Sequence, residues 1–335
     1  MKNVVFLSVI GFANVPNILN RYINEFSTKY RSTTISVLKH GKYEMCADYI
    51  MAHMSKLAAR QTLMPIFQSA DVFIFCNEIG YVCSDYIKNW FPDLCDLVKD
   101  STLIFYQTNQ PKTKYSPLLS RYDLCIFTPD AHSYYDGDAK VFIPGCPVNV
   151  PDDIDVLLNN RRNSGKIVVS HVPSRPEHKG TDVINEVMKR IVSKYDNIEW
   201  IYRTGLSYEE GMNIKRMSDI YIDQYTDGGG FGTSSIEALQ FGCITLATMH
   251  NVTDYESYPI TNIEYKDGAL YTLLDKLCGM DKEDLVDEME RVLRVVRERY
   301  TAEPYMKYFE QEILDAPKTS INRTGFIDQS LSLLI

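Results

Sequence analysis

Short runs of apolar, often β-branched residues alternate along the chain with longer segments whose apolar positions recur every three to four residues. The first pattern is typical of strands buried on both faces of a parallel sheet, and the second is typical of amphipathic helices. In the first half, the expected strands are Val4–Ile10, Thr33–Leu38, Asp71–Cys76, Thr102–Tyr106, Leu124–Phe127 and Lys140–Ile143. The expected helices are Pro16–Tyr30, Ala47–Gln68 and Cys83–Val98. This alternation predicts a doubly wound, Rossmann-like α/β domain over residues 1–150.

Prolines and acidic residues interrupt the alternation over residues 144–165, which we interpret as an interdomain linker. Expected strands then follow at Lys166–His171, Ile198–Tyr202, Ile220–Asp223 and Ile244–Ala247. Expected helices cover Gly180–Tyr195, Tyr208–Met217, Thr233–Phe241, Gly268–Cys278 and Lys282–Tyr300. A second domain of the same kind is therefore predicted over residues 166–300, with a last helix, Ala302–Leu314, and a polar tail over residues 301–335. Two such domains are expected to face a cleft, with ligands at the carboxyl ends of the strands.

The composition narrows the class of protein. Of 335 residues, 45% are hydrophobic and 24% are charged, as in a folded globular chain. No apolar run approaches the roughly 20 residues that span a bilayer, so we expect a cytoplasmic protein without an integral membrane segment. The eight cysteines show no Cys-x-x-Cys pair, which favours buried free thiols over disulfides or zinc. The net charge of -9 excludes a strongly basic nucleic-acid binder, and a polyanionic partner is expected only locally, in the nearly neutral first half.

Two cations mark the first candidate site. Arg175 and Lys179 lie in residues 171–180, between an expected strand and the start of an expected helix. We call these residues the cationic segment. The free N–H groups at a helix N-terminus already favour an anion, and arginine can hold a phosphate in a bidentate fork. The segment therefore predicts diphosphate binding, and two solvated surface charges are the alternative interpretation.

A glycine-rich turn marks the second candidate site. Gly228, Gly229, Gly230 and Gly232 precede an expected helix, where glycine lets the backbone approach a ligand closely. Residues 233–235 are expected to cap this helix. One turn inside it, Glu237 could accept two hydroxyl groups of a ribose; a flexible turn with a surface glutamate is the alternative. The turn lacks the Gly-Lys-Ser/Thr of a Walker loop, and the first strand-to-helix turn holds too few glycines for a dinucleotide fingerprint.

Metal-dependent chemistry finds little support in the sequence. Asp136-Gly137-Asp138 and Asp153-Ile154-Asp155 match an Asp-x-Asp pattern that could bind a metal-bound diphosphate. Both precede the cationic segment and lie in turn or linker sequence, where aspartates are usually solvated. Histidines at positions 40, 53, 132 and 250 lack a partner pattern for a metal or a nucleophilic triad. We expect no metal and no cofactor.

Three blocks of the sequence carry a resemblance. They are Val172-Pro173-Ser174 with Lys179-Gly180-Thr181-Asp182, then residues 218–224, and finally residues 230–239 with Gly242-Cys243. In this order and spacing, the stretch from Lys166 to Leu246 resembles the nucleotide-sugar-binding domain of GT-B glycosyltransferases, in particular the retaining GT4-type group. The blocks cover about a quarter of the chain, and the first half matches weakly. The resemblance implies a GT-B fold, with the last helix crossing back to the first domain.

The resemblance also implies roles for single residues. Arg175 and Lys179 match the positions that hold the donor diphosphate, and Glu237 matches the second Glu of a Glu-x7-Glu motif that binds the donor ribose. The remaining candidate donor-binding residues are those of the glycine turn, of the base-binding region and of the first strand-to-helix turn: Gly229, Gly230, Phe231, Gly232, Thr233, Arg203, Thr204, Gly205, Gly11 and Asn14.

Two departures from the family pattern affect the expected mechanism. The first motif Glu falls at Gly229, and Asp227 close by could replace it. Where many relatives have His-Gly-Ser, this chain has a segment that ends in Asn109, whose neutral amide cannot act as a base. Retaining transfer by a front-face route needs mainly leaving-group stabilisation and alignment, so activity remains compatible with both changes. The candidate catalytic residues are Arg175, Lys179, Asp227 and Asn109.

The implied activity is sugar transfer from a nucleoside diphosphate sugar, such as a UDP-sugar, to a hydroxyl acceptor. The acceptor is expected to be a glycan, a lipid-linked glycan or a hydroxymethylated base of phage DNA. Two alternatives stay open. One is a catalytically inactive GT-B module that binds a nucleotide or glycan, which Gly229 favours. The other is a nucleotide-sugar epimerase or phosphorylase of the same architecture.

Overall fold

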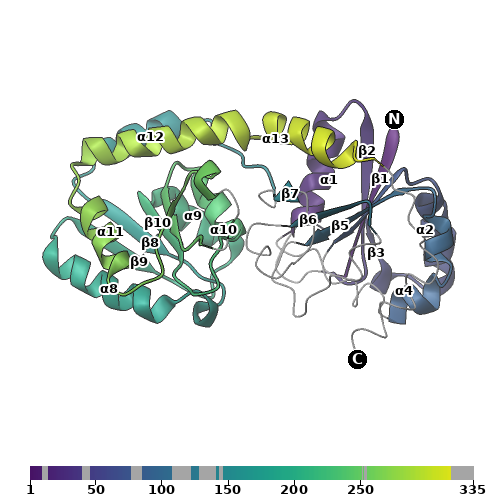
Figure 1. The fold of residues 1–335 in the computed structure, drawn as a ribbon, viewed down its shortest axis with the longest axis horizontal. Coiled ribbons are helices and arrows are strands. Elements are labelled where there is room, and N and C mark those ends of the chain that lie inside the picture. The colour runs from purple at the N-terminus through teal and green to yellow at the C-terminus, as the bar shows by residue number, and fades with distance from the viewer. Residues whose placement is uncertain are drawn as a thin grey trace. The chain divides into compact units, whose positions relative to one another are not determined.

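The computed structural model describes residues 1–9, 14–39, 46–76, 85–107, 122–127, 141–142, 146–250, 252 and 255–317 (Figure 1). The chain forms two compact units. The first unit comprises Met1–Cys146 together with Tyr305–Ile335, and the second unit comprises Pro147–Pro304. Each unit is built on one parallel sheet.

The sheet of the first unit has the strand order β3-β2-β1-β4-β5-β6-β7, and all its described pairs are parallel. Its strands are β1 (Lys2–Ser8), β2 (Tyr30–Ser36), β3 (Tyr49–Ile50), β4 (Val72–Cys76), β5 (Thr102–Gln107), β6 (Leu124–Phe127) and β7 (Val141–Phe142). The connections after β1 and β3 run in opposite directions along the sheet, which is the order of a doubly wound fold.

Helices cover both faces of this sheet, because successive residues of a strand point to opposite sides. Val5 and Leu7 of β1 are buried in one cluster, whereas Val4 and Phe6 are buried in another. The first cluster includes residues of α2 (Lys56–Gln68), α4 (Asp85–Trp90) and α5 (Leu94–Leu97), and the second those of α1 (Val15–Phe26) and α13 (Ala302–Phe309). The doubly wound architecture predicted for the first half is confirmed.

The end of the described chain belongs to the first unit. Figure 1 shows α13 beside α1, and α13 continues into a π-helical turn, Glu310–Leu314. Tyr305 and Phe309 are buried against the face of β1 that α1 also covers. Just beyond the turn, Asp315 accepts a hydrogen bond of 2.5 Å from the Tyr30 hydroxyl. The predicted last helix that crosses back to the first domain is therefore confirmed.

The sheet of the second unit has the strand order β12-β11-β10-β8-β9, again with parallel pairs. Its strands are β8 (Ile167–His171), β9 (Ile198–Tyr202), β10 (Ile220–Gln224), β11 (Ile244–Ala247) and β12 (Ile260–Asn262). Its helices are α7 (Ile154–Arg162), α8 (Thr181–Lys194), α9 (Tyr208–Met217), α10 (Thr233–Leu239), α11 (Ala269–Cys278) and α12 (Lys282–Arg299). Here β8 and β10 are neighbours although β9 separates them in sequence. The topological switch point, where ligands of such sheets bind, lies between these two strands.

Three expectations about elements are wrong in detail, and one strand was missed. The expected linker contains α7, whose Ile154 and Leu158 are buried in the core of the second unit. The expected helix 47–68 begins only at Lys56, because the side chain of Ser55 caps it and residues 49–50 pair with β2 instead. The expected helix 83–98 is divided into α4 and α5, since Pro92 follows α4 and cannot continue its hydrogen bonding. Strand β12 was not predicted, because three residues carry too little periodicity.

The described cysteines agree with the prediction of free thiols. The side chains of six cysteines are described, and all six are free thiols. Five of these six are buried, namely Cys76, Cys125, Cys146, Cys243 and Cys278. Burial raises the pKa of the Cys243 thiol to about 11, which keeps it protonated near neutral pH. Among the described residues, no helix combines the length and the apolar character that crossing a bilayer requires.

Candidate functional site at the carboxyl edge of the second sheet

The segments after β8 and β10 contact each other at the switch point of the second unit. The N–H of Tyr225, just after β10, donates to the carbonyl of Lys179 at 3.0 Å. Gly180 has a φ of +68°, and a Cβ added there would lie 2.0 Å from the Tyr225 carbonyl oxygen. Only glycine allows this approach, so Gly180 docks the end of the first segment onto the second. The contact brings Lys179 next to the glycine turn.

Lys179 is held by two consecutive residues at the end of β10. Its ammonium donates to Oδ1 of Asp223 at 2.9 Å and to Oε1 of Gln224 at 2.8 Å. The other carboxylate oxygen of Asp223 accepts from the N–H of Gly232 at 2.9 Å and from the hydroxyl of Ser235 at 2.8 Å. Burial acts to raise the pKa of Asp223, but the Lys179 charge and these hydrogen bonds outweigh burial and hold the pKa below its usual value. Lys179 is therefore neutralised by a buried, ionised carboxylate.

The start of α10 differs from the expected cap. Gly232 is the N-cap residue, and no side chain of residues 233–235 caps the helix. Asp223 accepts the N–H of Gly232 instead, so the capping carboxylate comes from the preceding strand. The Ser234 hydroxyl is 2.5 Å from the Tyr221 hydroxyl, and Phe231 is buried against Tyr258 with a ring separation of 4.9 Å. The prediction was wrong because the sequence pattern does not show which polar groups the fold brings to the first turn.

The glycine turn has backbone conformations that suit glycine. Gly229 has a φ of 56° and Gly230 a φ of 117°, values that side-chain-bearing residues rarely adopt. The N–H of Gly230 donates to the carbonyl of Thr248 at 2.5 Å, and its own carbonyl accepts from Nε2 of Gln224 at 2.6 Å. The N–H groups of Gly230 and Gly232 are thus used inside the turn. Within the described residues, the N–H groups of Phe231 and Thr233 are among those without a hydrogen-bond partner, so a ligand could use them.

Glu237 lies on α10, one turn beyond these groups, and its carboxylate contacts the ammonium of Lys215 from α9. The Lys215 side chain is only 5% exposed, whereas that of Glu237 is 20% exposed. A half-buried carboxylate that is fixed by a buried cation and still reaches solvent is suited to accepting hydroxyl groups of a ligand.

His171, the last residue of β8, fixes the start of the cationic segment. Its Nδ1 donates to the carbonyl of Ile222 at 2.7 Å, so Nε2 of the neutral ring accepts from the Thr181 hydroxyl at 2.9 Å. Burial lowers the pKa of this imidazole to about 4. His171 is neutral at physiological pH and joins β8, β10 and the first residue of α8.

The remaining predicted residues of the second unit are exposed. The Arg175 guanidinium forms no hydrogen bond or ion pair with the described residues, and the Asp227 side chain is exposed while its carbonyl accepts from His250 at 2.8 Å. Arg203 is exposed after β9, and the Thr204 hydroxyl donates to the carbonyl of Pro173 at 3.2 Å. That bond joins the expected base-binding region, which includes Gly205, to the segment that carries Arg175.

The sequence also singles out residues that belong to other parts of the chain. Gly11 and Asn109 lie outside the described residues, as do Asp136 and Asp138. Asn14 belongs to the first unit, where it has a φ of 58° before α1 and accepts from Asn17 at 2.7 Å. The other Asp-x-Asp pair lies at the start of α7, where Asp153 pairs with Arg216 and Asp155 with Arg297. Both carboxylates are engaged by arginines.

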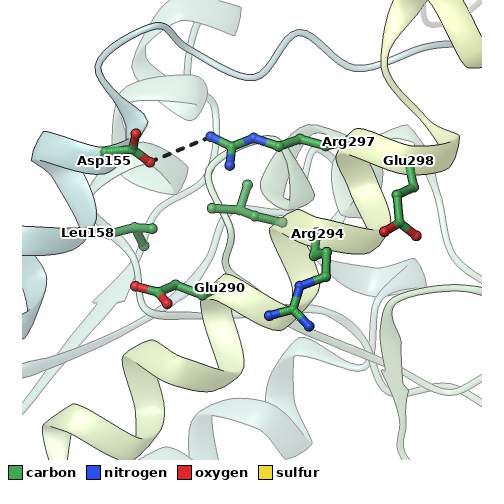
Figure 2. Close-up of a pocket in the computed structure, with 7 residues that line it drawn as sticks. Asp155, Leu158, Glu290, Arg294, Arg297 and Glu298 are labelled. Atoms are coloured by element: carbon green, nitrogen blue, oxygen red, sulfur yellow. Dashed lines mark ion pairs between the residues drawn. The ribbon is translucent and has the colours of Figure 1, made fainter.

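A surface groove of about 500 Å³ lies elsewhere in the second unit, between α7 and α12 (Figure 2). It is lined by Asp155, Leu158, Glu290, Leu293, Arg294, Arg297 and Glu298. Figure 2 shows Arg297 directed toward Asp155, with a separation of 3.6 Å between the charged atoms. None of the candidate catalytic or donor-binding residues lines this groove, and its charges are of mixed sign.

Sequence reasoning missed the residues that hold the site together. Asp223, Gln224 and Thr248 make most of the bonds that connect Lys179 with the glycine turn. A signal was present, since an acid and an amide that end an apolar strand sit where ligands of parallel sheets bind. Their partners depend on strand order, which the sequence does not display.

No family model and no curated protein match this chain. Solved structures do resemble it in fold. A glycosyltransferase from Rickettsia africae is 14% identical, with a TM-score of 0.56 over 94% of this chain and 100% of that chain. HepE from Anabaena, solved with UDP and glucose, is 11% identical, with a TM-score of 0.53 over 93% and 100%. A protein from Listeria monocytogenes assigned as a UDP-N-acetylglucosamine 2-epimerase is 14% identical, with a TM-score of 0.51 over 96% and 100%. The chain therefore has the fold of two Rossmann-like domains that GT-B glycosyltransferases and such epimerases share.

Proposed function

We propose that this protein is a glycosyltransferase that transfers a sugar from a nucleoside diphosphate sugar to a hydroxyl acceptor. The observation that carries the proposal is the docking of Lys179 against the glycine turn at the switch point of the second sheet. A lysine ammonium and free backbone N–H groups at one sheet edge form a site for phosphate. Glu237, one helical turn away on α10, adds a carboxylate for the hydroxyl groups of a ribose.

The charges at this site suit a leaving diphosphate. Asp223 and Gln224 take two of the three donors of the Lys179 ammonium, and the third is left for a phosphate oxygen. Arg175 is exposed and without an internal partner, so its guanidinium is available to hold a second phosphate oxygen. As the bond between the sugar and the diphosphate breaks, negative charge grows on the leaving oxygen, and these cations stabilise it. We propose that the donor pyrophosphate lies between Arg175 and Lys179.

We further propose retention of configuration without a metal, as in the GT4-type group that the sequence resembles. In this route the acceptor hydroxyl attacks from the face that the leaving group departs, and its proton passes to the departing phosphate oxygen. Such a reaction needs alignment and charge stabilisation rather than a protein base. It is compatible with Gly229 in place of the first motif glutamate.

A UDP-sugar is the first donor to test, because one fold relative was solved with UDP and glucose. Glycans, lipid-linked glycans and hydroxymethylated DNA remain the proposed acceptor classes. The protein is incubated with UDP-glucose, UDP-N-acetylglucosamine and GDP-mannose, with EDTA present, and products are followed by mass spectrometry. A transferase releases nucleotide slowly without an acceptor and faster with the correct one. Tight donor binding without any turnover would contradict the proposal and indicate a binding module.

An epimerase is the second candidate, because one fold relative is assigned to that class. The same experiment separates the two activities. An epimerase converts UDP-N-acetylglucosamine into a stereoisomer of the same mass without an acceptor, and NMR of the recovered nucleotide sugar detects the inverted centre. A transferase leaves the unreacted donor unchanged.

A further inference from the structure

Gln224 connects the two halves of the candidate phosphate site through the two ends of one amide. Its Oε1 accepts from the Lys179 ammonium at 2.8 Å, and its Nε2 donates to the carbonyl of Gly230 at 2.6 Å. The residue is only 7% exposed. One buried side chain thus joins the cation that follows β8 to the turn that follows β10.

An irregularity in β10 makes this connection possible. Successive residues of a regular strand point to opposite faces of the sheet, so Asp223 and Gln224 would not be expected to contact the same group. The pairing of β10 with β11 shifts in register between Ile222 and Gln224, as at a β-bulge. Both side chains then reach the Lys179 ammonium. Bulges of this kind redirect side chains beside functional sites.

The two residues that contact the Lys179 ammonium have different roles. Asp223 supplies charge, since its buried carboxylate neutralises the ammonium. Gln224 adds no charge and therefore does not alter the electrostatic balance of the site. It does orient the carbonyl of Gly230, while Thr248 accepts the N–H of the same residue. With both polar groups of Gly230 fixed, the following N–H groups, those of Phe231 and Thr233, keep a defined direction relative to Lys179.

We propose that Gln224 is a positioning residue that sets the phosphate recognition of the site by coupling Lys179 to the glycine turn. The inference rests on the proposed use of a nucleoside diphosphate sugar. It predicts that changes at Gln224 alter the binding of the phosphates and leave the binding of the nucleoside unchanged. A residue with a purely structural role would weaken both together.

Three variants test the coupling. Gln224→Met keeps the length and burial of the side chain and removes both hydrogen bonds. Gln224→Glu keeps an acceptor for Lys179 but sets a carboxylate against the Gly230 carbonyl. Gln240→Met is the matched control, the same change at a half-buried glutamine at the end of α10 that has no contact with Lys179 or the glycine turn. Affinities for UDP and for uridine are measured by calorimetry, and thermal unfolding verifies that each variant folds.

We expect Gln224→Met to weaken UDP binding about tenfold, as the loss of one to two kcal/mol of oriented hydrogen bonding would. Gln224→Glu should weaken it further, because a second carboxylate repels the phosphates, and uridine affinity should stay constant throughout. Unchanged UDP affinity in Gln224→Met, or an equal loss for UDP and uridine, would overturn the positioning role while leaving the proposed function intact. Wild-type protein that binds neither UDP nor GDP would instead contradict the proposed donor, and the role of Gln224 with it.

Discussion

Lys215 and Glu237 form an ion pair between α9 and α10 in which the cation is buried and the carboxylate is partly exposed. The Lys215 ammonium also lies 5.5 Å from the centre of the Tyr221 ring. The contact uses Oε2 of Glu237, and Oε1 forms no hydrogen bond with the described residues. Lys215 therefore fixes the orientation of the carboxylate that we propose for ribose binding.

The first prediction concerns this pair. Lys215→Met should lower the free energy of unfolding by about 3 kcal/mol, because it leaves a half-buried carboxylate without its cation. The double variant Lys215→Met/Glu237→Gln should recover part of that loss, which urea unfolding measures. Both variants should bind UDP more weakly than wild type.

A third variant, Glu237→Ala, tests the ribose contact directly. It should weaken the binding of UDP more than the binding of 2′-deoxy-UDP. Equal losses for the two nucleotides after Glu237→Ala would show that the carboxylate does not contact the 2′-hydroxyl of the ribose.

The second prediction follows from the buried pair of Lys179 and Asp223. In wild type the pKa of Asp223 is lowered, so its contribution to stability is present above about pH 3.9, the unfolded-state value, and is lost at lower pH. In Lys179→Met the hydrogen bonds from Gly232 and Ser235 remain, but the positive charge that offsets burial is gone. Burial should then raise the pKa of Asp223, so the variant should lose stability as the pH rises from 4 to 7. The difference in the free energy of unfolding between wild type and variant should widen by about 2 to 3 kcal/mol over that range.

Removing the carboxylate as well tests this explanation. Lys179→Met/Asp223→Asn should show no such widening, because position 223 then carries no carboxyl group that could ionise. Urea unfolding at pH 4, 5.5 and 7 provides the comparison. If the difference in the free energy of unfolding between wild type and Lys179→Met stays constant with pH, other contacts keep Asp223 charged.

The third prediction concerns His171, whose pKa is lowered to about 4 by burial. Between pH 6.5 and 4 the unfolded chain binds a proton at this residue and the folded chain does not, so stability falls as the pH falls through this window. The free energy of unfolding of wild type should therefore fall by about 2 kcal/mol between pH 7 and 5, relative to that of His171→Gln. His178→Gln, the same change at an exposed histidine of the same segment, is the matched control. Identical pH profiles for wild type and His171→Gln would contradict the prediction.

The sequence predicts the parts of this protein whose signals are local. Val4 to Leu7 read as a buried strand, and their alternate burial on two faces of the first sheet follows from that pattern. Lys179 and the glycine turn could be placed at one sheet edge because the carboxyl ends of parallel strands share an edge. The resemblance to a known family then selected Glu237 from the many surface glutamates.

What could not be predicted depends on contacts between distant segments. The partner of Glu237 is Lys215, 22 residues earlier, and no periodicity relates the two positions. Asp223 has the sequence context of a strand end, but its role as the cap of α10 depends on a register shift in β10. Helix α7 was interpreted as linker because its buried face comprises little more than Ile154 and Leu158, too few positions to show helical periodicity.

The fourth prediction tests the docking of the two segments. Gly180→Ala should destabilise the protein by at least 3 kcal/mol, because the new Cβ would lie 2.0 Å from a backbone oxygen at a positive φ. Gly268→Ala is the control, since Gly268 has a φ of +78° and open space around its Cβ position. That change should cost about 1 kcal/mol, the penalty of the backbone conformation alone. Thermal and urea unfolding give both values, and equal costs would mean that the Tyr225 contact yields easily.

The fifth prediction separates binding from chemistry at Arg175. Because its guanidinium is exposed and has no partner among the described residues, Arg175→Ala should change stability by less than about 0.5 kcal/mol. If Arg175 stabilises the charge that develops on the leaving diphosphate, turnover should fall roughly 100-fold while UDP affinity falls only a few-fold. Arg175→Lys, which keeps the charge without the bidentate fork, should recover part of the turnover.

Donor turnover is measured as nucleotide release, and UDP affinity by calorimetry. Arg294→Ala, at an exposed arginine of α12 in the groove of Figure 2, is the matched control and should leave both quantities unchanged. A loss of affinity as large as the loss of turnover would assign Arg175 to uniform binding of donor and transition state. An unchanged turnover would instead show that Arg175 does not act on the leaving diphosphate. Lys179 would then be the one cationic side chain that our proposal places beside that group.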